Sequence, residues 1–359
     1  MSANRIIRVL VVDDSTYIRK VITQMLSRSP FIEVVAAARD GEEALELVEE
    51  LNPDVVTLDL MMPRLDGVGF LRAQMKKRPI PVVVVSIASE AGQMALSALD
   101  AGAVDFVQKP TALATEKVFE IAAELIEKVK AAAEVRLSRM PVSEARENLI
   151  ASTEPPAFGA TQIDIVVLGI STGGPHALRR LIPRLPANLP VPMAVVLHMP
   201  VGYTEIYAQH LNDESPIEVR EAYEGAELAP GSVLMARAGR HLTFSRRENG
   251  RVLAHLDVAP LDLPHRPSVD VLFKSAAETY GGRVLGVVMT GMGNDGLAGA
   301  AAIKARGGRL ITESEETCVV YGMPRAIVEA GLSDRSVPLD QMALAIISEI
   351  AGTTATGAY

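Results

Sequence analysis

Gly169-Ile170-Ser171-Thr172-Gly173-Gly174 is the stretch that determines how the second half of this 359-residue chain is interpreted. The largely apolar residues 163–168 come before it, and a helical pattern that opens with Pro175 follows it. The sequence therefore predicts a strand, a tight turn and a helix. Glycines that bracket a serine satisfy the G-x-S-x-G pattern, in which a sharp turn lifts the serine hydroxyl above the edge of a sheet. Ser171 is thus a candidate nucleophile.

The same turn has other interpretations. A helix that begins near Pro175 aims unpaired N–H groups back at the turn, where they can stabilise an oxyanion or bind a phosphate. A Ser-Thr-Gly-Gly turn that enters a helix also occurs in α/β proteins without catalysis. Which role applies to Ser171 depends on whether a base and an acidic residue lie within hydrogen-bond reach of its hydroxyl.

The composition favours a two-domain α/β protein. The length suggests about two domains, and 48% of the residues are hydrophobic although Trp is absent and aromatic residues make up only 4%. Cores built from Val, Ile, Leu and Ala are typical of buried parallel strands covered by helices. The single cysteine, Cys318, has no second thiol for a disulfide or a metal site, and we expect it to be a small buried residue.

Charge and hydropathy exclude two classes of protein. A net charge of −9 argues against nucleic acid as the main partner, because phosphate contacts need a basic surface. No apolar stretch reaches the roughly 18 residues that a membrane span needs, and the N-terminus has no signal-peptide pattern. We expect a cytoplasmic protein without membrane insertion.

The first half of the chain repeats a strand and helix rhythm. Residues 6–12 form an apolar run, and Ser15 follows as a predicted N-cap. Further strands are predicted at residues 31–37, 54–58, 82–85 and 103–107, with helices between them. Five strands that alternate with helices predict a doubly wound parallel sheet.

Polar residues stand at the ends of these predicted strands, where the sites of such sheets lie. They are Asp13, Asp14, Asp59, Ser86 and Lys109. Crowded carboxylates repel unless a divalent cation sits among them, and Mg²⁺ takes carboxylates together with waters and phosphate oxygens. The cluster therefore predicts phosphoryl transfer, with Asp59 as the nucleophile and with Ser86 and Lys109 on the phosphoryl oxygens. Taken singly, Lys109 is equally well a surface lysine and Ser86 a strand-end hydroxyl.

Residues 5 to about 128 resemble a response-regulator receiver domain of flavodoxin-like fold. The motifs that carry the resemblance are Asp13-Asp14, Asp59-Leu-Met-Met-Pro63, Asp66-Gly67, Ser86 and Phe106-Val-Gln-Lys109-Pro110. The resemblance implies that Asp59 is phosphorylated and that a histidine kinase is the phosphodonor.

The resemblance also implies a metal site and a switch. Asp13, Asp14 and Asp59 would hold Mg²⁺ together with the backbone carbonyl of Met61, a position where relatives often carry an acidic residue. Because only the carbonyl is used there, we expect Met61 to have little effect. The switch residues would be Ser86, Phe106 and Lys109.

The domain organisation follows from a change in composition. Between residues 129 and 162 the pattern dissolves into Ala, Glu, Arg, Ser and Pro, which indicates a linker whose first part continues the preceding helix. We therefore predict a receiver domain at 1–128, a linker at 129–162 and a second domain at 163–352.

The second domain contains further strand and turn signals. A predicted strand at residues 191–197 is followed directly by His198. Asn249-Gly250 comes after a short predicted strand at 242–245 and before another run of strand-like residues, which predicts a β-hairpin inserted beside the sheet. Ser268 is a predicted N-cap of a helix that runs to about Tyr280.

A predicted strand at 284–290 runs into Gly291-Met-Gly293-Asn-Asp295-Gly296, a formal G-x-G-x-x-G. A Rossmann interpretation would put a dinucleotide on this turn and its ribose on Glu313. The unit comes last in the domain, however, and Asp295 would repel a pyrophosphate. A hydrolase interpretation instead uses Asp295 to orient a histidine and the glycine turn to supply N–H donors.

A serine hydroxyl needs a base within hydrogen-bond reach and a third group that holds the base. Ser171, His198 and Asp295 each follow a predicted strand and meet this requirement, since triads depend on geometry and not on chain order. A core histidine remains the alternative for His198, and His176 and His265 are competing bases.

The second domain resembles the chemotaxis protein-glutamate methylesterases. The motifs are Gly169–Gly174, His198-Met-Pro200, Gly239-Arg-His-Leu242, His265-Arg-Pro-Ser-Val-Asp270, Thr290–Gly296 and Val320-Tyr-Gly-Met-Pro-Arg325. The resemblance implies a doubly wound parallel-sheet esterase domain that hydrolyses glutamate γ-methyl esters on chemoreceptors, often deamidates receptor glutamines, and needs no cofactor.

The same resemblance assigns roles to matching positions. Ser171 would be the nucleophile, His198 the general base and Asp295 its orienter. The oxyanion donor would be the Met292 backbone N–H, with Thr172 and Gly293 in support.

The two halves together predict a phosphorylation-regulated methylesterase for sensory adaptation. Unphosphorylated, the receiver domain would cover the Ser171 cleft, and phosphorylation of Asp59 would expose it. The alternative is a response regulator whose output domain binds a nucleotide or a protein without hydrolysis. The predicted partners are methylated chemoreceptors and a chemotaxis-type histidine kinase.

Overall fold

The computed structural model describes residues 5–109, 116–135 and 162–352, except for the side chains of 88–92 and 116–120. Its contacts divide the chain into two units, Met1–Asn148 and Leu149–Tyr359. Among the described residues no helix is long and apolar enough to cross a membrane.

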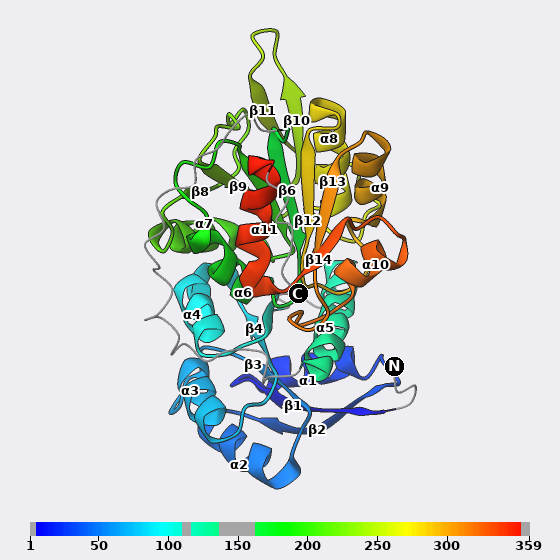
Figure 1. The fold of residues 1–359 in the computed structure, drawn as a ribbon. Helices are drawn as coiled ribbons and strands as arrows, with labels where there is room; N and C mark the ends of the chain where they lie inside the picture. The colour runs from blue at the N-terminus through cyan, green and yellow to red at the C-terminus, as the bar shows by residue number, and fades with distance from the viewer. Residues whose placement is uncertain (1–4, 110–115, 136–161, 353–359) are drawn as a thin grey trace. The chain divides into compact units, whose positions relative to one another are not determined.

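The first unit is a parallel sheet between helices, at the blue to cyan end of the ribbon (Figure 1). The strands are β1 (Ile7–Val12), β2 (Ile32–Ala38), β3 (Val55–Leu58), β4 (Val82–Ser86) and β5 (Asp105–Gln108). The helices are α1 (Thr16–Leu26), α2 (Gly41–Leu51), α3 (Gly67–Lys77), α4 (Ala88–Asp100) and α5 (Glu116–Glu134). All pairs are parallel, in the order β2-β1-β3-β4-β5. The predicted doubly wound sheet is confirmed.

Local chemistry explains where these elements begin. The valine-rich strands β3 and β4 are buried along their whole length, as expected for a sheet covered on both faces. Three helices start at a side chain that accepts a backbone N–H of the first turn: Ser15 for α1, Asp40 for α2 and Asp66 for α3. The N-cap predicted at Ser15 is therefore confirmed.

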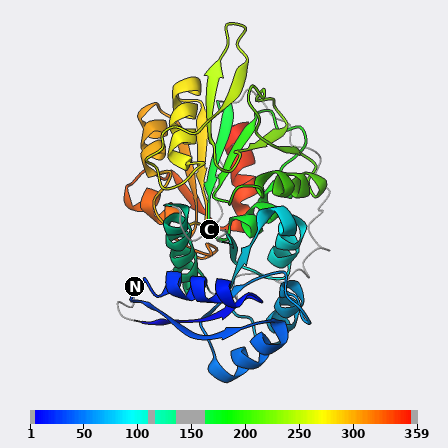
Figure 2. The ribbon, with the colours of Figure 1, turned by 180° about the vertical axis from the view of Figure 1, so that it is seen from behind.

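The second unit contains a larger parallel sheet (green to red in Figures 1 and 2). Its strands are β6 (Ile165–Ile170), β7 (Met193–Leu197), β8 (Glu218–Glu221), β9 (Ser232–Met235), β12 (Val284–Val288), β13 (Arg309–Glu313) and β14 (Arg335–Val337). The order is β14-β13-β12-β6-β7-β9-β8, and every pair is parallel. The α-helices are α6 (Gly174–Leu181), α7 (Thr204–Asp213), α8 (Val269–Tyr280), α9 (Leu297–Ala305), α10 (Met323–Glu329) and α11 (Leu339–Ala351).

The predicted hairpin consists of β10 (His241–Arg246) and β11 (Val252–Asp257), which pair antiparallel across the turn at Asn249-Gly250. It forms a sheet of its own beside the large one. Its apolar face packs on α8, where the Ser275 hydroxyl accepts the Phe244 backbone N–H at 2.7 Å. The hairpin thereby covers α8 without extending the main sheet.

The strand order is the feature that builds the site of the second unit. β6 lies at the centre, with β12 on one side and β7 on the other. Because all three run parallel, their C-terminal ends meet at one edge. The segments that follow these strands carry Ser171, His198 and Asp295.

Candidate functional site

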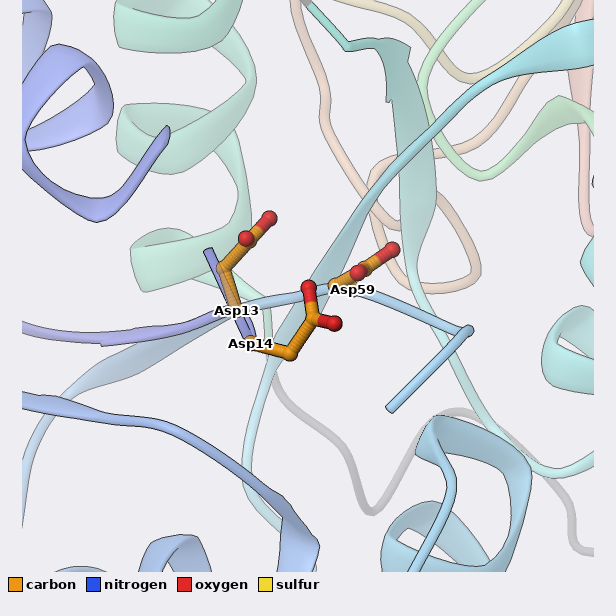
Figure 3. A group of neighbouring side chains, drawn as sticks. All are labelled: Asp13, Asp14 and Asp59. Carbon is orange, nitrogen blue, oxygen red and sulfur yellow. The ribbon is translucent and has the colours of Figure 1, made fainter. Parts of the chain in front are cut away.

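The first unit brings three carboxylates together at one sheet edge. Asp13 and Asp14 follow β1 and Asp59 follows β3, its neighbour in the sheet. One oxygen of each lies within 4.8 Å of the others, and Figure 3 shows the three side chains grouped there. Hard oxygen donors at this spacing fit a divalent cation such as Mg²⁺.

Lys109, which follows β5, contacts two of these carboxylates. Its Nζ lies 2.8 Å from Asp13 Oδ2 and 2.9 Å from Asp59 Oδ2. Burial raises the pKa of both carboxyl groups, although the lysine opposes that rise. Burial alone would lower the pKa of Lys109, but its two carboxylate partners outweigh burial and raise it, so the amine stays charged.

A pocket of about 260 Å³ opens over Asp59. Its lining residues are Asp14, Asp59, Met61, Ser86, Ile87 and Lys109. This volume is enough for a phosphoryl group with hydrating waters. The predicted phosphorylation, metal and switch residues thus line one pocket, except for Asp13 and Phe106.

Phe106 is buried within β5, and a lysine that the sequence did not single out holds its backbone. Lys128 on α5 donates to the Phe106 carbonyl at 2.7 Å, and its Nζ lies 5.7 Å from the centre of the Phe106 ring. The same amine forms a buried ion pair with Asp105 at 3.0 Å. Lys128 stands on the otherwise apolar face of α5, and a lysine at such a position indicates a buried polar partner, so this was the sequence signal for the contact.

In the second unit, three side chains from three loops form a hydrogen-bonded line. Ser171 Oγ lies 3.1 Å from His198 Nδ1, and His198 Nε2 lies 2.9 Å from Asp295 Oδ2. The carboxylate can only accept, so Nε2 carries the proton and Nδ1 presents its lone pair to the serine hydroxyl. This is the tautomer that a base acting on Ser171 needs.

The nucleophile turn depends on its glycines. Gly173 has φ +80°, a region that residues with a Cβ avoid, and a Cβ there would lie 2.5 Å from the Val319 Cβ. The Gly174 N–H donates to the Ser171 carbonyl at 2.7 Å, which closes the turn into α6. Ser171 is consequently held at the sheet edge with 8% of its surface exposed.

Asp295 accepts hydrogen bonds from four groups. Besides His198, they are the Ser268 hydroxyl at 2.9 Å and the backbone N–H groups of Val269 at 2.8 Å and Asp270 at 3.0 Å. Burial alone would raise the pKa of Asp295, but the His198 hydrogen bond and charge, with the backbone donors, outweigh it and lower the pKa. Asp295 is therefore ionised and fixed in orientation.

Ser268 stands at the predicted N-cap position of α8, but its side chain does not cap the helix. The hydroxyl is used by Asp295, and the Ser268 N–H donates to His241 Nδ1 at 3.2 Å. Burial is the main cause that lowers the pKa of His241, whose Nε2 faces the Pro260 carbonyl at 3.1 Å. A capping signature cannot reveal that a distant carboxylate competes for the same hydroxyl.

The two competing histidines occupy different places relative to the site. His265 stacks on His198, with ring centroids 4.1 Å apart and 20° between the planes. His176 lies in the first turn of α6, and burial lowers its pKa. The Ser171 hydroxyl pairs with His198.

The predicted oxyanion residues flank the nucleophile. The Ser171 N–H donates to the Thr290 carbonyl at 3.0 Å, and a Cβ on Gly291 would lie 2.8 Å from the Ser171 Cβ. The chain after Gly291 therefore passes directly beside the serine. Within the part of the chain that the structure describes, the N–H groups of Thr172, Met292 and Gly293 have no protein acceptor.

Comparison with known proteins agrees with both units. A family model described as CheB methylesterase matches residues 166–346, about half of the chain, and one described as response regulator receiver domain matches residues 9–119. The chain belongs to the CheB methylesterase family. Its receiver domain precedes the region that defines this family.

Members of the CheB family resemble the chain over nearly its whole length. A Myxococcus xanthus protein named protein-glutamate methylesterase/protein-glutamine glutaminase 5 is 54% identical, covering 94% of this chain and 96% of its own. A Symbiobacterium thermophilum protein of the same name, without the number, is 45% identical, and the match covers 95% of this chain and 96% of that protein. The Thermotoga maritima CheB methylesterase catalytic domain has a TM-score of 0.51 at 42% identity, covering 52% of this chain and 98% of that one.

The glycine-rich turn of this CheB-family chain is not arranged for a dinucleotide. Asp295 is occupied by its four donors, and Glu313 is completely buried, with one carboxylate oxygen 2.9 Å from the Thr290 N–H. A side chain without exposed surface cannot reach a ribose hydroxyl. The Rossmann interpretation is therefore not supported.

Proposed function

We propose that the chain is a protein-glutamate methylesterase that acts through Ser171, His198 and Asp295. The observation that carries the proposal is the line of hydrogen bonds from Ser171 Oγ through His198 to an ionised Asp295. The names of its relatives supply the substrate bond, a methyl ester of a protein glutamate, and we infer from the family resemblance that this glutamate lies on a chemoreceptor.

The reaction begins when Ser171 Oγ attacks the ester carbonyl carbon and passes its proton to His198 Nδ1. Asp295 stabilises the imidazolium, and the N–H of Met292, with Thr172 and Gly293, stabilises the oxyanion. The tetrahedral intermediate expels methoxide, which takes the proton from His198 and leaves as methanol. Water then attacks the acyl-serine by the same steps and releases glutamate.

A primary amide fits the same sequence of steps, with ammonia as the leaving group in place of methanol. The imidazolium of His198 donates the proton that the nitrogen needs. We therefore infer that the chain also deamidates receptor glutamines; the names of its relatives state a protein-glutamine glutaminase activity for those proteins.

We infer that phosphorylation of Asp59 controls this activity. Asp13, Asp14 and Asp59, with the Met61 carbonyl, would hold Mg²⁺, which would offset the charge of an incoming phosphoryl group. Lys109 and the switch residues Ser86 and Phe106 would respond to the phosphoryl oxygens. A coupling of about 1 to 3 kcal/mol between the two sites corresponds to roughly 5- to 150-fold activation.

The proposed partners are methylated chemoreceptors and a chemotaxis-type histidine kinase in the cytoplasm. The receiver-family match and the acidic cluster support the kinase, and the methylesterase match supports the receptor.

The decisive experiment measures methanol released from methyl-esterified chemoreceptor by wild type and Ser171→Ala, with and without Mg²⁺ and a small phosphodonor. We expect release that needs Ser171 and rises with phosphodonor. Methanol release that does not change with phosphodonor would refute the proposed regulation by phosphorylation. No methanol release by wild type would refute the proposed esterase activity.

Ser245 offers a matched control. Its Oγ lies 2.6 Å from His255 Nε2, and His255 Nδ1 lies 2.7 Å from Glu224 Oε1. In this second Ser-His-carboxylate line, Ser245 lies inside strand β10 and not at a helix N-terminus, and Glu224 is 63% exposed, where water screens its charge. We expect Ser245→Ala to keep wild-type activity.

A further inference from the structure

Glu313 is a buried carboxylate at the end of β13 that the proposed mechanism does not use. It has no exposed surface. Its Oε2 accepts the Thr290 N–H at 2.9 Å and its Oε1 accepts the Thr317 hydroxyl at 3.0 Å. Burial raises its pKa although these donors oppose the rise. Burying a carboxylate is costly, so its retention here calls for a reason.

Thr290, the partner of Glu313, connects the segments around the nucleophile. Its carbonyl accepts the Ser171 N–H at 3.0 Å, and its hydroxyl donates to the Thr172 carbonyl at 3.0 Å. The same hydroxyl accepts the Val320 N–H at 3.0 Å. All three polar groups of Thr290 are thus engaged, and among the residues that the structure describes Glu313 alone accepts its N–H.

The segment that Thr290 begins carries the proposed oxyanion donors. Gly291 follows directly, its N–H donates to the Val320 carbonyl at 3.0 Å, and its carbonyl accepts the Met323 N–H at 2.8 Å. Met292 and Gly293 come next in the chain. A rotation of the Thr290 peptide would therefore displace the donors relative to Ser171 Oγ.

We propose that Glu313, acting through Thr290, is a positioning residue that sets the oxyanion N–H groups of residues 292–293 beside Ser171. The inference rests on the proposed function, because an oxyanion forms only if Ser171 attacks an ester. It explains why an acceptor with two oxygens occupies this buried position: one oxygen holds the Thr290 peptide and the other is fixed by Thr317.

Glu313→Leu keeps the approximate volume and removes both acceptors, which leaves the Thr290 N–H unpaired. Because N–H groups act on an oxyanion only at about 2.7 to 3.1 Å, we expect kcat to fall about 10- to 100-fold with little change in KM. Glu313→Gln retains one oxygen for the Thr290 N–H and should recover part of the loss. Glu316→Leu is the matched control, since Glu316 is exposed in the same loop.

General destabilisation would also lower kcat, so the deciding measurement is a ratio. A peptide with one glutamate γ-methyl ester is compared with its thionoester, in which sulfur replaces the carbonyl oxygen. Sulfur is a poor acceptor for N–H groups placed for oxygen, so wild type should strongly prefer the oxygen ester. In Glu313→Leu the preference should fall by about 10-fold or more while Glu316→Leu keeps it.

A folded Glu313→Leu protein with the wild-type preference would overturn the inference and leave the proposed function intact. If wild type releases no methanol from the oxygen ester, the proposed function fails first and the inference with it. Should Glu313→Leu not fold, the same ratio is measured on Glu313→Met, whose flexible side chain adapts to the same space and also lacks a carboxylate for the Thr290 N–H. A wild-type preference there would equally overturn the inference.

Discussion

Replacing Asp295 by asparagine tests how the carboxylate controls His198. The change keeps the size of the side chain but puts an NH₂ group where an oxygen now accepts. Each Asp295 oxygen accepts two donors: Oδ2 from His198 and Val269, and Oδ1 from Ser268 and Asp270. Either orientation of the amide therefore turns a donor toward a backbone N–H.

The magnitude follows from these contacts. An unpaired backbone N–H costs about 1 to 3 kcal/mol of stability in both orientations, so neither is strongly preferred. With the amide nitrogen toward Ser268, His198 keeps its tautomer but its imidazolium loses a charge partner, which is worth about 4 kcal/mol or roughly 10³ in rate. With the nitrogen toward His198, the proton moves to Nδ1 and Ser171 loses its base, a loss of about 10⁴ in triads of this kind.

We expect kcat for methanol release to fall about 10³- to 10⁴-fold in Asp295→Asn. The ¹⁵N signals of the His198 ring report which nitrogen carries the proton. Asp262→Asn, on an exposed neighbouring loop, removes the same charge and should change neither measurement. A folded Asp295→Asn protein that loses less than about 10-fold in kcat would refute the assignment of Asp295 as orienter.

Three further predictions concern the receiver pocket, a buried ion pair and pH. Asp59→Asn should abolish phosphoryl incorporation from a small phosphodonor, which mass spectrometry detects; incorporation at an unchanged level would move the acceptor elsewhere. Lys128→Met leaves Asp105 buried and unpaired, so denaturant unfolding of the first unit should show a loss of about 3 to 5 kcal/mol, against at most about 0.5 for the more exposed Lys130→Met. The folded-state pKa of Asp295 lies below its ordinary value of 3.8, so the ionised carboxylate contributes its full stabilisation of the fold above pH 3.8 and loses it as the pH falls through the folded-state pKa. The difference in free energy of unfolding between wild type and Asp295→Asn should therefore narrow from about pH 5 to about pH 2. A difference that stays constant over this range would contradict the pKa shift.

Much of the fold could be predicted because its signals are local. The alternation of apolar runs with helical patterns predicted the first parallel sheet, and the turn at Asn249-Gly250 predicted the hairpin, whereas the second parallel sheet was implied by the family resemblance. Helix starts such as Ser15 depend on a side chain and a backbone group within one turn. Ser268 shows the limit of such rules, because a carboxylate far along the chain takes its hydroxyl.

The sequence by itself determined which residue types stand at the ends of strands: carboxylates and a lysine in the first half, and a serine, a histidine and an aspartate in the second. Only the tertiary structure decided that β12, β6 and β7 are neighbours, which brings Ser171, His198 and Asp295 into one line. It also decided that Glu313 faces inward to the Thr290 peptide. The physical reason is that periodicity and turn chemistry act over a few residues, whereas strand order and buried hydrogen bonds depend on how distant segments pack together.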